Sequence, residues 1–543
     1  MSETRHAQSY KRNPVRENYD VIVIGSGIGG LAAAALLAKH GRKKVLVLER
    51  HYTAGGFTHV FHRPGYEWDV GVHYVGDVAP GSVLRAMFDE VTNGQLAWAD
   101  MGEVYDRVVL GDEVYDFPKG REKLRTYLKG RFPGEEAAID AYFQAVRSAL
   151  STSLSFHAEK ALPGPVAAVA GPFLRHRFLR WSDRTTRDVL EGFTRNQKLI
   201  GVLTAQFGDY GLPPSEASFM VHAMVANHYF DGGYYPVGGS ARIAETIIPV
   251  IERAGGKVLV SAEVASLVVQ DGRVVGVKMA SDGAELRAPV VVSDAGVANT
   301  FTRLLPREVA LRHGLLEKLR TVRPSSAHLC LYLGFKHTAQ ELGLPRHNLW
   351  IYPHERHEDG ITASRANPDA ELPVVYVSFP AAKDPDFARR HPGRATVEVI
   401  TAAPHSWFAQ WDGTTWKKRG ADYDALKQRL TERLLESLYR QLPQLRGKVD
   451  FQELSTPLTT QHFANHASGE IYGVDHTPQR FRQRFLKPAT AVPGLFLTGQ
   501  DVVTCGVAGA LFGGALTASA VLKGNLVATI LRSAQEKARP QAA

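Results

Sequence analysis

Residues 19–56 read YDVIVIGSGIGGLAAAALLAKHGRKKVLVLERHYTAGG, and this stretch decides the fold. An apolar, β-branched segment ends at Gly25 and is typical of a buried strand. The alanine- and leucine-rich segment from Leu31 favours a helix that ends at Gly41. A second strand pattern, KKVLVLE, ends in Glu49. The order of strand, glycine turn, helix and strand predicts a βαβ unit.

The glycine spacing in this unit matches a phosphate-binding turn. Gly25, Gly27 and Gly30 occupy the G-x-G-x-x-G positions. The first glycine permits the tight turn, the second lets a pyrophosphate approach the backbone, and the third lets helix and strand pack closely. The helix N-terminus offers free N–H groups to the phosphates, and Glu49 is placed to accept hydrogen bonds from a ribose. The unit therefore predicts dinucleotide binding.

A membrane segment is the alternative interpretation of the same stretch. Residues 21–38 carry no charge, and that length reaches the lower limit for a membrane-spanning helix. Glycines are concentrated between Gly25 and Gly30, however, where an anchor has little use for them. The run also continues into a strand pattern without a cleavage-type segment, so we expect no secretion signal.

Bulk composition indicates a globular protein of several lobes. The chain has 543 residues, 44% of them hydrophobic and 22% charged, which predicts two or three lobes and no long disordered region. Its two cysteines, Cys330 and Cys505, lack the number and spacing of a disulfide framework or a zinc site, and a reducing, cytosol-like compartment fits best. The net charge of +9 fits either a soluble basic surface or attraction to an anionic membrane. No nucleic-acid partner is expected, because no aromatic and basic recognition motif accompanies the charge.

Two features favour FAD over NAD as the dinucleotide. The segment HYTAGG places Gly55 and Gly56 where backbone can lie close to a long cofactor. Residues 493–524, PGLFLTGQDVVTCGVAGALFGGALTASAVLKG, predict a strand, a turn with Gly499 and Asp501, and a helix from about Gly506. Such a turn can hydrogen-bond a ribityl chain or phosphate, and the helix would aim its positive end at the flavin pyrimidine. A membrane helix or plain core is the alternative for this helix, although its small residues suit close packing.

Four segments carry a resemblance to a known family. Residues 21–41, 45–77, 469–481 and 495–526 resemble the retinol saturase branch of the carotenoid isomerase and phytoene desaturase flavoproteins, and the resemblance covers the whole chain. It implies an α/β fold, in which a Rossmann-type FAD-binding domain is combined with a substrate domain of mixed sheet and helices, as in amine oxidases. It also implies non-covalent FAD and a long apolar polyene or prenyl-type substrate. Saturation of a carbon–carbon double bond is the leading activity; cis–trans isomerisation, desaturation and a non-catalytic role as a prenyl-lipid escort are alternatives.

The resemblance also assigns parts of the cofactor site. It implies that backbone near Val264 meets the adenine and that the segment SDAG, residues 293–296, closes the sheet. Phe57 stands where related flavoproteins often carry an arginine, so no pyrophosphate contact is expected from it. The expected cofactor-binding residues are Gly25, Gly27, Gly29, Gly30, Glu49, Arg50, Gly55, Gly56, Val264, Gly499, Asp501, Gly506 and Val507.

Strand and helix patterns assign the remaining sequence to domains. Strand patterns such as AHLCLYLGF, PVVYVSF and ATVEVIT predict a sheet that lines an apolar tunnel. We expect a flexible N-terminus at 1–18, FAD-binding parts at 19–79, 230–300 and 461–530, a helical substrate- or membrane-facing region at 80–229, a substrate domain at 301–460 and a C-terminal tail at 531–543.

One stretch suggests a membrane contact. Residues 161–181, ALPGPVAAVAGPFLRHRFLRW, hold about 14 apolar residues and three prolines, too few residues to span a bilayer. Apolar, basic and aromatic residues together are typical of an interfacial segment. A buried loop at the mouth of the substrate lobe is the alternative. The expected location is the cytoplasm, with peripheral attachment to the inner face of a membrane where that contact forms.

Saturation of a double bond needs a hydride from flavin on one carbon and a proton on the other. His73, Tyr472 and Tyr235 are the chosen proton-donor candidates, and the first two are preferred because they lie in the family-like segments. A structural or cofactor-orienting role is the alternative for each of them and for the neighbouring candidates Asp69, Tyr74, Asp77, Tyr234, Asp475 and His476. The segment HERHED, residues 354–359, matches no ordered ligand motif, so we expect a solvated loop and no metal. A single glycine fingerprint predicts no built-in nicotinamide domain, and therefore a separate electron donor.

Overall fold

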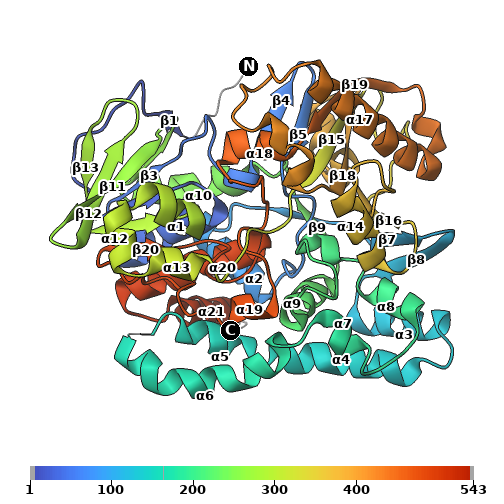
Figure 1. Cartoon of the computed structure of the whole chain (residues 1–543), viewed down its shortest axis with the longest axis horizontal. Coiled ribbons are helices and arrows are strands. Elements are labelled where there is room, and N and C mark those ends of the chain that lie inside the picture. Colours follow the sequence, from blue (N-terminus) through green and yellow to red (C-terminus); the bar gives the residue numbers. More distant parts are fainter. Residues whose placement is uncertain (1–6, 163, 539–543) are drawn as a thin grey trace, which may run out of the picture.

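A computed structural model describes residues 7–162 and 164–538 (Figure 1). Its first layer is a parallel six-stranded sheet in the order β1-β10-β3-β2-β14-β20. The strands come from the two ends and the middle of the chain, which is why this domain is discontinuous in sequence. Their bounds are Gln8–Ser9 (β1), Lys257–Val260 (β10), Val45–Leu48 (β3), Val21–Ile24 (β2), Val290–Ser293 (β14) and Leu495–Leu497 (β20).

Both faces of this sheet are covered, as buried parallel strands require. In β2, Val21 and Val23 pack under helices, whereas Ile22 and Ile24 pack on the opposite face. The helices on the first face are α1 (Ile28–Gly41), α2 (Val83–Thr92), α10 (Arg242–Arg253), α20 (Gly506–Leu522) and α21 (Leu526–Ala538). The predicted βαβ unit, the helix end at Gly41 and the helix from Gly506 are confirmed.

An antiparallel sheet covers the other face. It consists of β11 (Val264–Gln270), β12 (Arg273–Met279) and β13 (Glu285–Arg287) and is seen at the left of Figure 1. The predicted hairpin at Asp271-Gly272 is confirmed, because Gln270 pairs with Arg273 and both turn residues have positive φ.

Helix α20 belongs to the core of this domain. A Cβ on Gly514 would lie 2.6 Å from the carbonyl oxygen of Gly29, so α1 and α20 touch through backbone. Among the described residues, the only segment with the length and composition of a membrane span is α20 joined to Leu526–Glu536, and that pair is bent by 111°.

The second layer is a seven-stranded mixed sheet in the order β19-β15-β18-β17-β16-β7-β8. Alternate residues of its strands face opposite sides: Leu331 and Leu333 pack toward helix α17 (Ala421–Gln441), whereas Cys330 and Tyr332 point the other way. The strands span Val449–Ser455 (β19), His328–Phe335 (β15), Ala395–Ala402 (β18), Val375–Ser378 (β17), Asn348–Tyr352 (β16), Val104–Leu110 (β7) and Glu113–Pro118 (β8).

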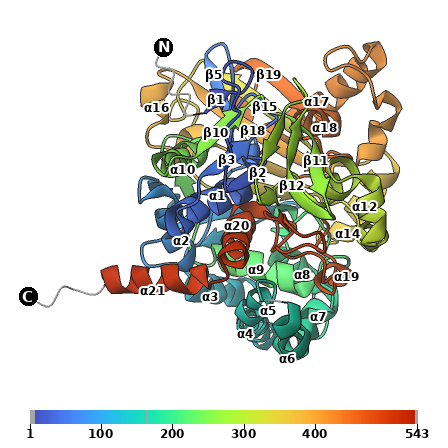
Figure 2. The same cartoon turned by 90° about the vertical axis from the view of Figure 1, so that its left-hand side faces the viewer.

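A helical lobe forms the lower edge of the molecule in Figures 1 and 2. Its helices are α3 (Arg121–Arg131), α4 (Glu136–Leu150), α5 (Ser153–Glu159), α6 (Gly164–Ser182), α7 (Thr186–Leu190), α8 (Gln197–Leu203) and α9 (Phe219–Tyr229). The connecting elements are β4 (Val60–Arg63), β5 (Tyr66–Asp69), β6 (Trp98–Asp100), β9 (Tyr234–Pro236), α11 (Val297–Asn299), α12 (Arg307–Arg312), α13 (Leu315–Leu319), α14 (His357–Ala366), α15 (Pro380–Lys383), α16 (Phe387–Arg390), α18 (Pro457–Ala464) and α19 (Pro478–Phe481).

Three segments differ from the predicted organisation. Residues 8–9 form an edge strand on β10 and Tyr10 is 1% exposed, so the flexible N-terminus does not extend through residues 7–18. The region 80–229 contains β6, β7 and β8, and the last two complete the seven-stranded sheet. Helix α21 continues to Ala538, where a tail was expected. The expectations for residues 1–6 and 539–543 lie outside the described residues.

Candidate functional site

A cavity of about 1100 Å³ lies between the two large sheets. Its lining includes Gly25 and Asp501 from the six-stranded sheet and Tyr376 and Ile400 from the seven-stranded sheet. Ordinary small-molecule pockets hold roughly 300–1,000 Å³. The cavity therefore has room for a large cofactor together with part of a second molecule.

One end of the cavity is a cradle of glycines. Gly25, Gly55 and Gly56 have φ of 97°, 120° and 54°, a backbone region that favours glycine. A Cβ on Gly56 would lie 2.9 Å from the Cα of Gly27, and one on Gly27 would lie 2.6 Å from Oδ2 of Asp294. A side chain at these positions would fill the space that close approach by a pyrophosphate requires. The residues present thus fit a dinucleotide.

The first turn of α1 presents donors to the same space. The first N–H groups of a helix have no partner within the helix. Gly30 N donates to Oδ2 of Asp294 at 2.9 Å, and Leu31 N donates to Gly27 O at 2.9 Å. The N–H groups of Ile28 and Gly29 are left for an anion at this positive helix end.

The side chain of Asp294 packs against the glycine cradle and supports it. The sequence reasoning did not single out this residue. Its side chain lies against Gly25, Gly27, Gly29 and Gly499, and it lines the cavity. Burial raises the pKa of Asp294 to about 8. A neutral acid at this place can carry a proton on Oδ1 and does not repel a neighbouring pyrophosphate, as a carboxylate would.

The pKa of Asp294 predicts that the affinity for FAD, the dinucleotide expected from the sequence, depends on pH. Because an ionised Asp294 would repel the pyrophosphate, we expect FAD affinity to fall about tenfold per pH unit above pH 8. The variant Asp294→Asn should remove this dependence and retain FAD. The measurement is the FAD dissociation constant between pH 6.5 and 9.5, with Asp20→Asn as an exposed control in the same domain. A wild-type affinity that stays constant with pH would contradict the role of Asp294.

Glu49 lies at the end of β3, as the sequence predicted. Its Oε2 accepts hydrogen bonds from the N–H and hydroxyl of Ser26 at 2.9 and 2.7 Å, and its Oε1 accepts from His51 N at 2.7 Å. The residue is 8% exposed and lines the cavity. These bonds orient the carboxylate, and its remaining lone pairs can accept from a ribose.

Asp501 joins three distant segments beside the cavity. Its Oδ2 accepts from Val297 N at 2.8 Å and its Oδ1 accepts from Val474 N at 2.9 Å. Arg480, 2% exposed, donates to the carbonyls of Val474, Val503, Gln500 and Asp501 and so shapes the same turn. Sequence reasoning missed Arg480, although it lies in the family-like segment 469–481.

Most of the predicted cofactor residues meet at this end of the cavity. Gly30 and Gly499 do not line it; they pack instead, since a Cβ on Gly30 would lie 2.3 Å from Gly25 O and one on Gly29 would lie 2.4 Å from Gly499 Cα. The predicted residues that line the cavity are Gly25, Gly27, Gly29, Glu49, Arg50, Gly55, Gly56, Val264, Asp501, Gly506 and Val507.

His73 lines the cavity and is held by a buried polar row. Its Nδ1 lies 2.9 Å from Oε2 of Glu398, a fully buried residue of β18 whose Oε1 accepts from Asp69 N at 2.9 Å. Lys383, 1% exposed, donates to the backbone carbonyl of His73 at 2.9 Å and to Ser378 Oγ at 2.8 Å. These contacts fix the ring and leave its Nε2 for the cavity.

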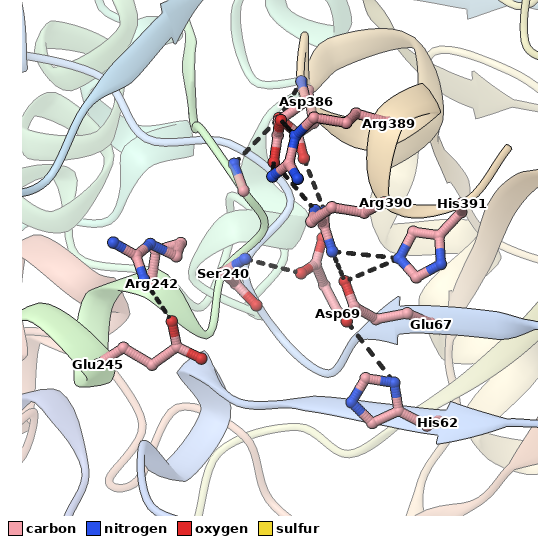
Figure 3. Close-up of polar contacts among 12 residues, drawn as sticks. His62, Glu67, Asp69, Ser240, Arg242, Glu245, Asp386, Arg389, Arg390 and His391 are labelled. Atoms are coloured by element: carbon pink, nitrogen blue, oxygen red, sulfur yellow. Dashed lines mark hydrogen bonds and ion pairs between the residues drawn. The ribbon is translucent and has the colours of Figure 1, made fainter. Parts of the chain in front are cut away.

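The strand before His73 is anchored at two further points (Figure 3). Glu67 in β5 pairs with Arg390, which also binds Asp384 at 2.8 Å. Oδ1 of Asp69 accepts from Ser240 N at 3.1 Å, and Tyr235 donates its hydroxyl proton to Oδ2. The segment that leads to His73 is therefore held in place.

Burial sets the protonation of this row. It raises the pKa of Glu398 to about 8 and that of Asp69 to about 7, and it lowers the pKa of His73 to about 3. At neutral pH Glu398 is then protonated and donates to Nδ1 of a neutral His73. The imidazole consequently carries its own proton on Nε2, the nitrogen left for the cavity.

The other two proton-donor candidates differ in their surroundings. Tyr472 lines the cavity but donates its hydroxyl proton to Gly208 O at 2.9 Å. Tyr235 is 1% exposed, does not line the cavity and bonds to Asp69, so the structure gives it a place behind His73. Of the three, His73 alone combines a place in the cavity with a buried acid behind it.

The segment HERHED is not a fully solvated loop. Helix α14 begins at His357, which is 2% exposed and whose Nε2 lies 2.9 Å from Gly201 O. The expectation failed because the contacts of His357 with Phe207 and Gly201 come from a distant segment of the chain. Within residues 7–162 and 164–538 no group of three or more potential ligand side chains is arranged to hold a metal.

Comparison with known proteins gives a consistent result. A family model described as flavin containing amine oxidoreductase matches residues 28–522. All-trans-retinol 13,14-reductases of Danio rerio and Homo sapiens are each 38% identical over 96% of this chain and 88% of their own length. The solved structure of cyclohexylamine oxidase from Brevibacterium oxydans superposes with a TM-score of 0.60 at 16% identity, over 96% of this chain and 100% of that one. The last likeness concerns the fold.

Proposed function

The chain belongs to the family of flavin-containing amine oxidoreductases, and on that premise we propose that it saturates a carbon–carbon double bond of a long apolar polyene. It is an FAD-dependent oxidoreductase. The observation that carries the proposal is the single cavity that joins the glycine cradle to a chamber between the sheets. The 38% identity to proteins named all-trans-retinol 13,14-reductase supports a retinoid- or carotenoid-like substrate.

The chamber suits a long unsaturated chain. Aromatic and aliphatic side chains supply most of its wall, and an elongated apolar substrate gains from leaving water there. Conjugated chains pack well against aromatic rings, two of which, Trp350 and Tyr376, lie with centroids 4.4 Å apart. The apolar and aromatic lining residues include Phe207, Trp350, Ile361, Val374, Tyr376 and Ile400.

The protein's part in the reaction is to hold the substrate, exclude water and deliver a proton. FAD held on the glycine cradle would supply the hydride for one carbon of the double bond. His73 presents Nε2–H to the chamber, and its proton goes to the other carbon. Glu398 then passes its own proton to Nδ1, so His73 returns to the neutral form. His73 then holds its proton on Nδ1, and the return of that proton to Glu398, with uptake of a solvent proton on Nε2 after product release, restores the starting state.

Product mass tests this proposal. The purified protein, with its FAD reduced in the absence of oxygen, is incubated with all-trans-retinol or with a poly-cis carotene. Addition of two hydrogen atoms to either substrate is expected. An unchanged mass with altered retention time would instead establish the isomerase alternative, and loss of two hydrogen atoms would establish a desaturase. A purified protein without flavin colour would favour the lipid escort.

We also infer a separate electron donor and a peripheral membrane site. Helix α6 exposes Val166, Val169 and Phe173, which are 50%, 76% and 83% exposed and lie on one helical stripe. Leu154 on the adjoining α5 is 72% exposed. The stretch is thus a surface helix and not the buried loop that was the alternative. Exposed Arg177 follows the stripe, which fits an anionic membrane at the cytoplasmic face.

Charge on this stripe should weaken membrane binding. Replacing Val169 and Phe173 together with glutamate is expected to lower binding to vesicles of phosphatidylcholine and phosphatidylserine by about 10–100-fold, because two apolar side chains no longer enter the interface. Vesicle flotation measures the effect. Leu311→Glu, at a residue of α12 that is 55% exposed, serves as a matched control. Equal binding by all three proteins would contradict the membrane site.

A further inference from the structure

A group of cations occupies the rim of the cavity. Lys417, Arg419 and Lys427 all line the cavity, and Lys417 is exposed, so the cavity reaches solvent here. Two aromatic rings accompany them. Lys417 Nζ lies 4.6 Å from the ring centre of Trp416, and the cationic groups of Arg419 and Lys427 lie 5.2 and 5.7 Å from that of Tyr423. These five residues are called the cationic vestibule below.

Within the described part of the chain, no carboxylate forms an ion pair with any of the three cations. Glu453 lines the same wall, but both of its oxygens bind Arg63, at 2.7 and 2.8 Å. Arg419 donates to Leu458 O at 3.3 Å, and its buried Nε has no partner. Asp424 also lines the cavity. It lies three positions before Lys427 in α17 and attracts it electrostatically, without forming an ion pair.

The arrangement is electrostatically costly without a ligand. Burial lowers the pKa of Lys427, and Arg419 and Lys417 lower it further, against the opposing attraction of Glu453 and Asp424. Cations gathered without counter-charge around a partly desolvated site attract anions, and an arginine with an unused N–H binds oxyanions well.

We propose that the cationic vestibule binds an oxyanion, a carboxylate or a phosphate, carried by a molecule that enters the cavity. Two sources share this chemistry. One is an ionised end group on the apolar substrate, which would rest at the rim while the chain lies in the chamber. The other is a phosphate of a soluble electron donor that approaches the cofactor from this side. The site goes beyond the reaction proposed above and does not depend on which bond is reduced.

Calorimetric titration of the FAD-loaded protein tests the site, since bound FAD keeps probes out of the glycine cradle. The probes are inorganic pyrophosphate, dodecanoate and, as an uncharged match for the latter, dodecanol. We expect saturable binding of at least one anion, weakened about tenfold or more by Lys427→Met and by Arg419→Gln. Lys418→Met is the matched control, because Lys418 is exposed in the same segment but does not line the cavity.

The outcomes separate the two sources. Binding of dodecanoate well above that of dodecanol, lost in Lys427→Met, assigns the site to the substrate end group. Binding of pyrophosphate with the same loss assigns it to the phosphate of an electron donor. If neither anion binds, or if Lys418→Met weakens binding as much as Lys427→Met, the vestibule is not an oxyanion site. FAD content and product mass are read separately, so failure here leaves the reductase proposal intact.

Discussion

Replacement of His73 by phenylalanine is expected to lower the rate of double-bond reduction by about 10²–10⁴-fold, the usual contribution of a general acid. Flavin content should not change, because His73 touches none of the hydrogen bonds that shape the glycine cradle. Phenylalanine keeps a ring beside Tyr376, whose centroid lies 5.5 Å from that of His73. The measurement is single-turnover reduction of substrate by enzyme whose FAD has been reduced beforehand.

The pH dependence of the same rate identifies the source of the proton. The pKa of Glu398 is raised to about 8, so the acid is protonated below that pH and His73 carries a proton on Nε2. As pH rises through 8, Glu398 ionises and draws the imidazole proton to Nδ1, which leaves Nε2 unprotonated. The rate should therefore decline above pH 8. In Glu398→Gln, measured with FAD in excess so that its weaker binding above pH 8 does not contribute, this decline should disappear, because glutamine does not titrate.

Tyr472→Phe discriminates between the two donors that line the cavity. The hydroxyl proton of Tyr472 is already donated to Gly208 O at 2.9 Å, so its loss should change the rate only slightly. A large fall in Tyr472→Phe with little change in His73→Phe would reverse the assignment and make Tyr472 the proton donor.

Local motifs were sufficient to predict the cofactor half of the fold. The turn at Gly25–Gly30, helix α1 and strand β3 depend on residues that are neighbours in the chain, so their pattern is visible in one window of sequence. The braces of that turn come from far away: Asp294 is more than 260 residues from Gly30, to which it bonds. No local pattern distinguishes such a residue from an ordinary strand-end acid.

Of the buried polar residues that hold His73, only Glu398 could have been suspected from the sequence. Strand β18 reads ATVEVITA, and a glutamate inside an apolar strand is unusual unless it has buried partners. Asp106 in β7 is similar, fully buried and bonded to Asn348 at 2.8 Å. Lys383 left no such signal, because it lies in a short helix and reaches His73 only in the folded chain. The strands β7 and β8 of region 80–229 are a different case: they pair with each other around the turn Gly111-Asp112, a local hairpin pattern that could have been recognised, and only the further partner β16 of β7 lies far along the chain.

The second large effect is expected on FAD binding. Gly27→Val should yield a folded but colourless protein. Its backbone φ of −59° accepts any residue, and the atoms nearest to an added Cβ are Oδ2 and Cγ of Asp294, side-chain atoms that can shift where backbone could not, at the cost of part of their support for the turn. The valine methyl groups would nevertheless fill the space that a pyrophosphate needs. Loss of two charged hydrogen bonds, each about 1.5–3 kcal/mol, corresponds to roughly 10²–10⁴-fold weaker FAD binding.

Two further glycines separate loss of cofactor from loss of fold. A Cβ on Gly29 would lie 2.4 Å from the Cα of Gly499, and this contact is backbone that cannot move aside, so Gly29→Ala should unfold the domain. Gly130 in α3 has no atom within 4 Å of its added Cβ, and Gly130→Ala should leave both fold and flavin intact. Flavin absorbance, circular dichroism and thermal unfolding with added FAD distinguish the variants Gly27→Val, Gly29→Ala and Gly130→Ala. If Gly27→Val retained its flavin colour, the pyrophosphate would have to lie elsewhere than over Gly27, and the cradle would lose its assigned role.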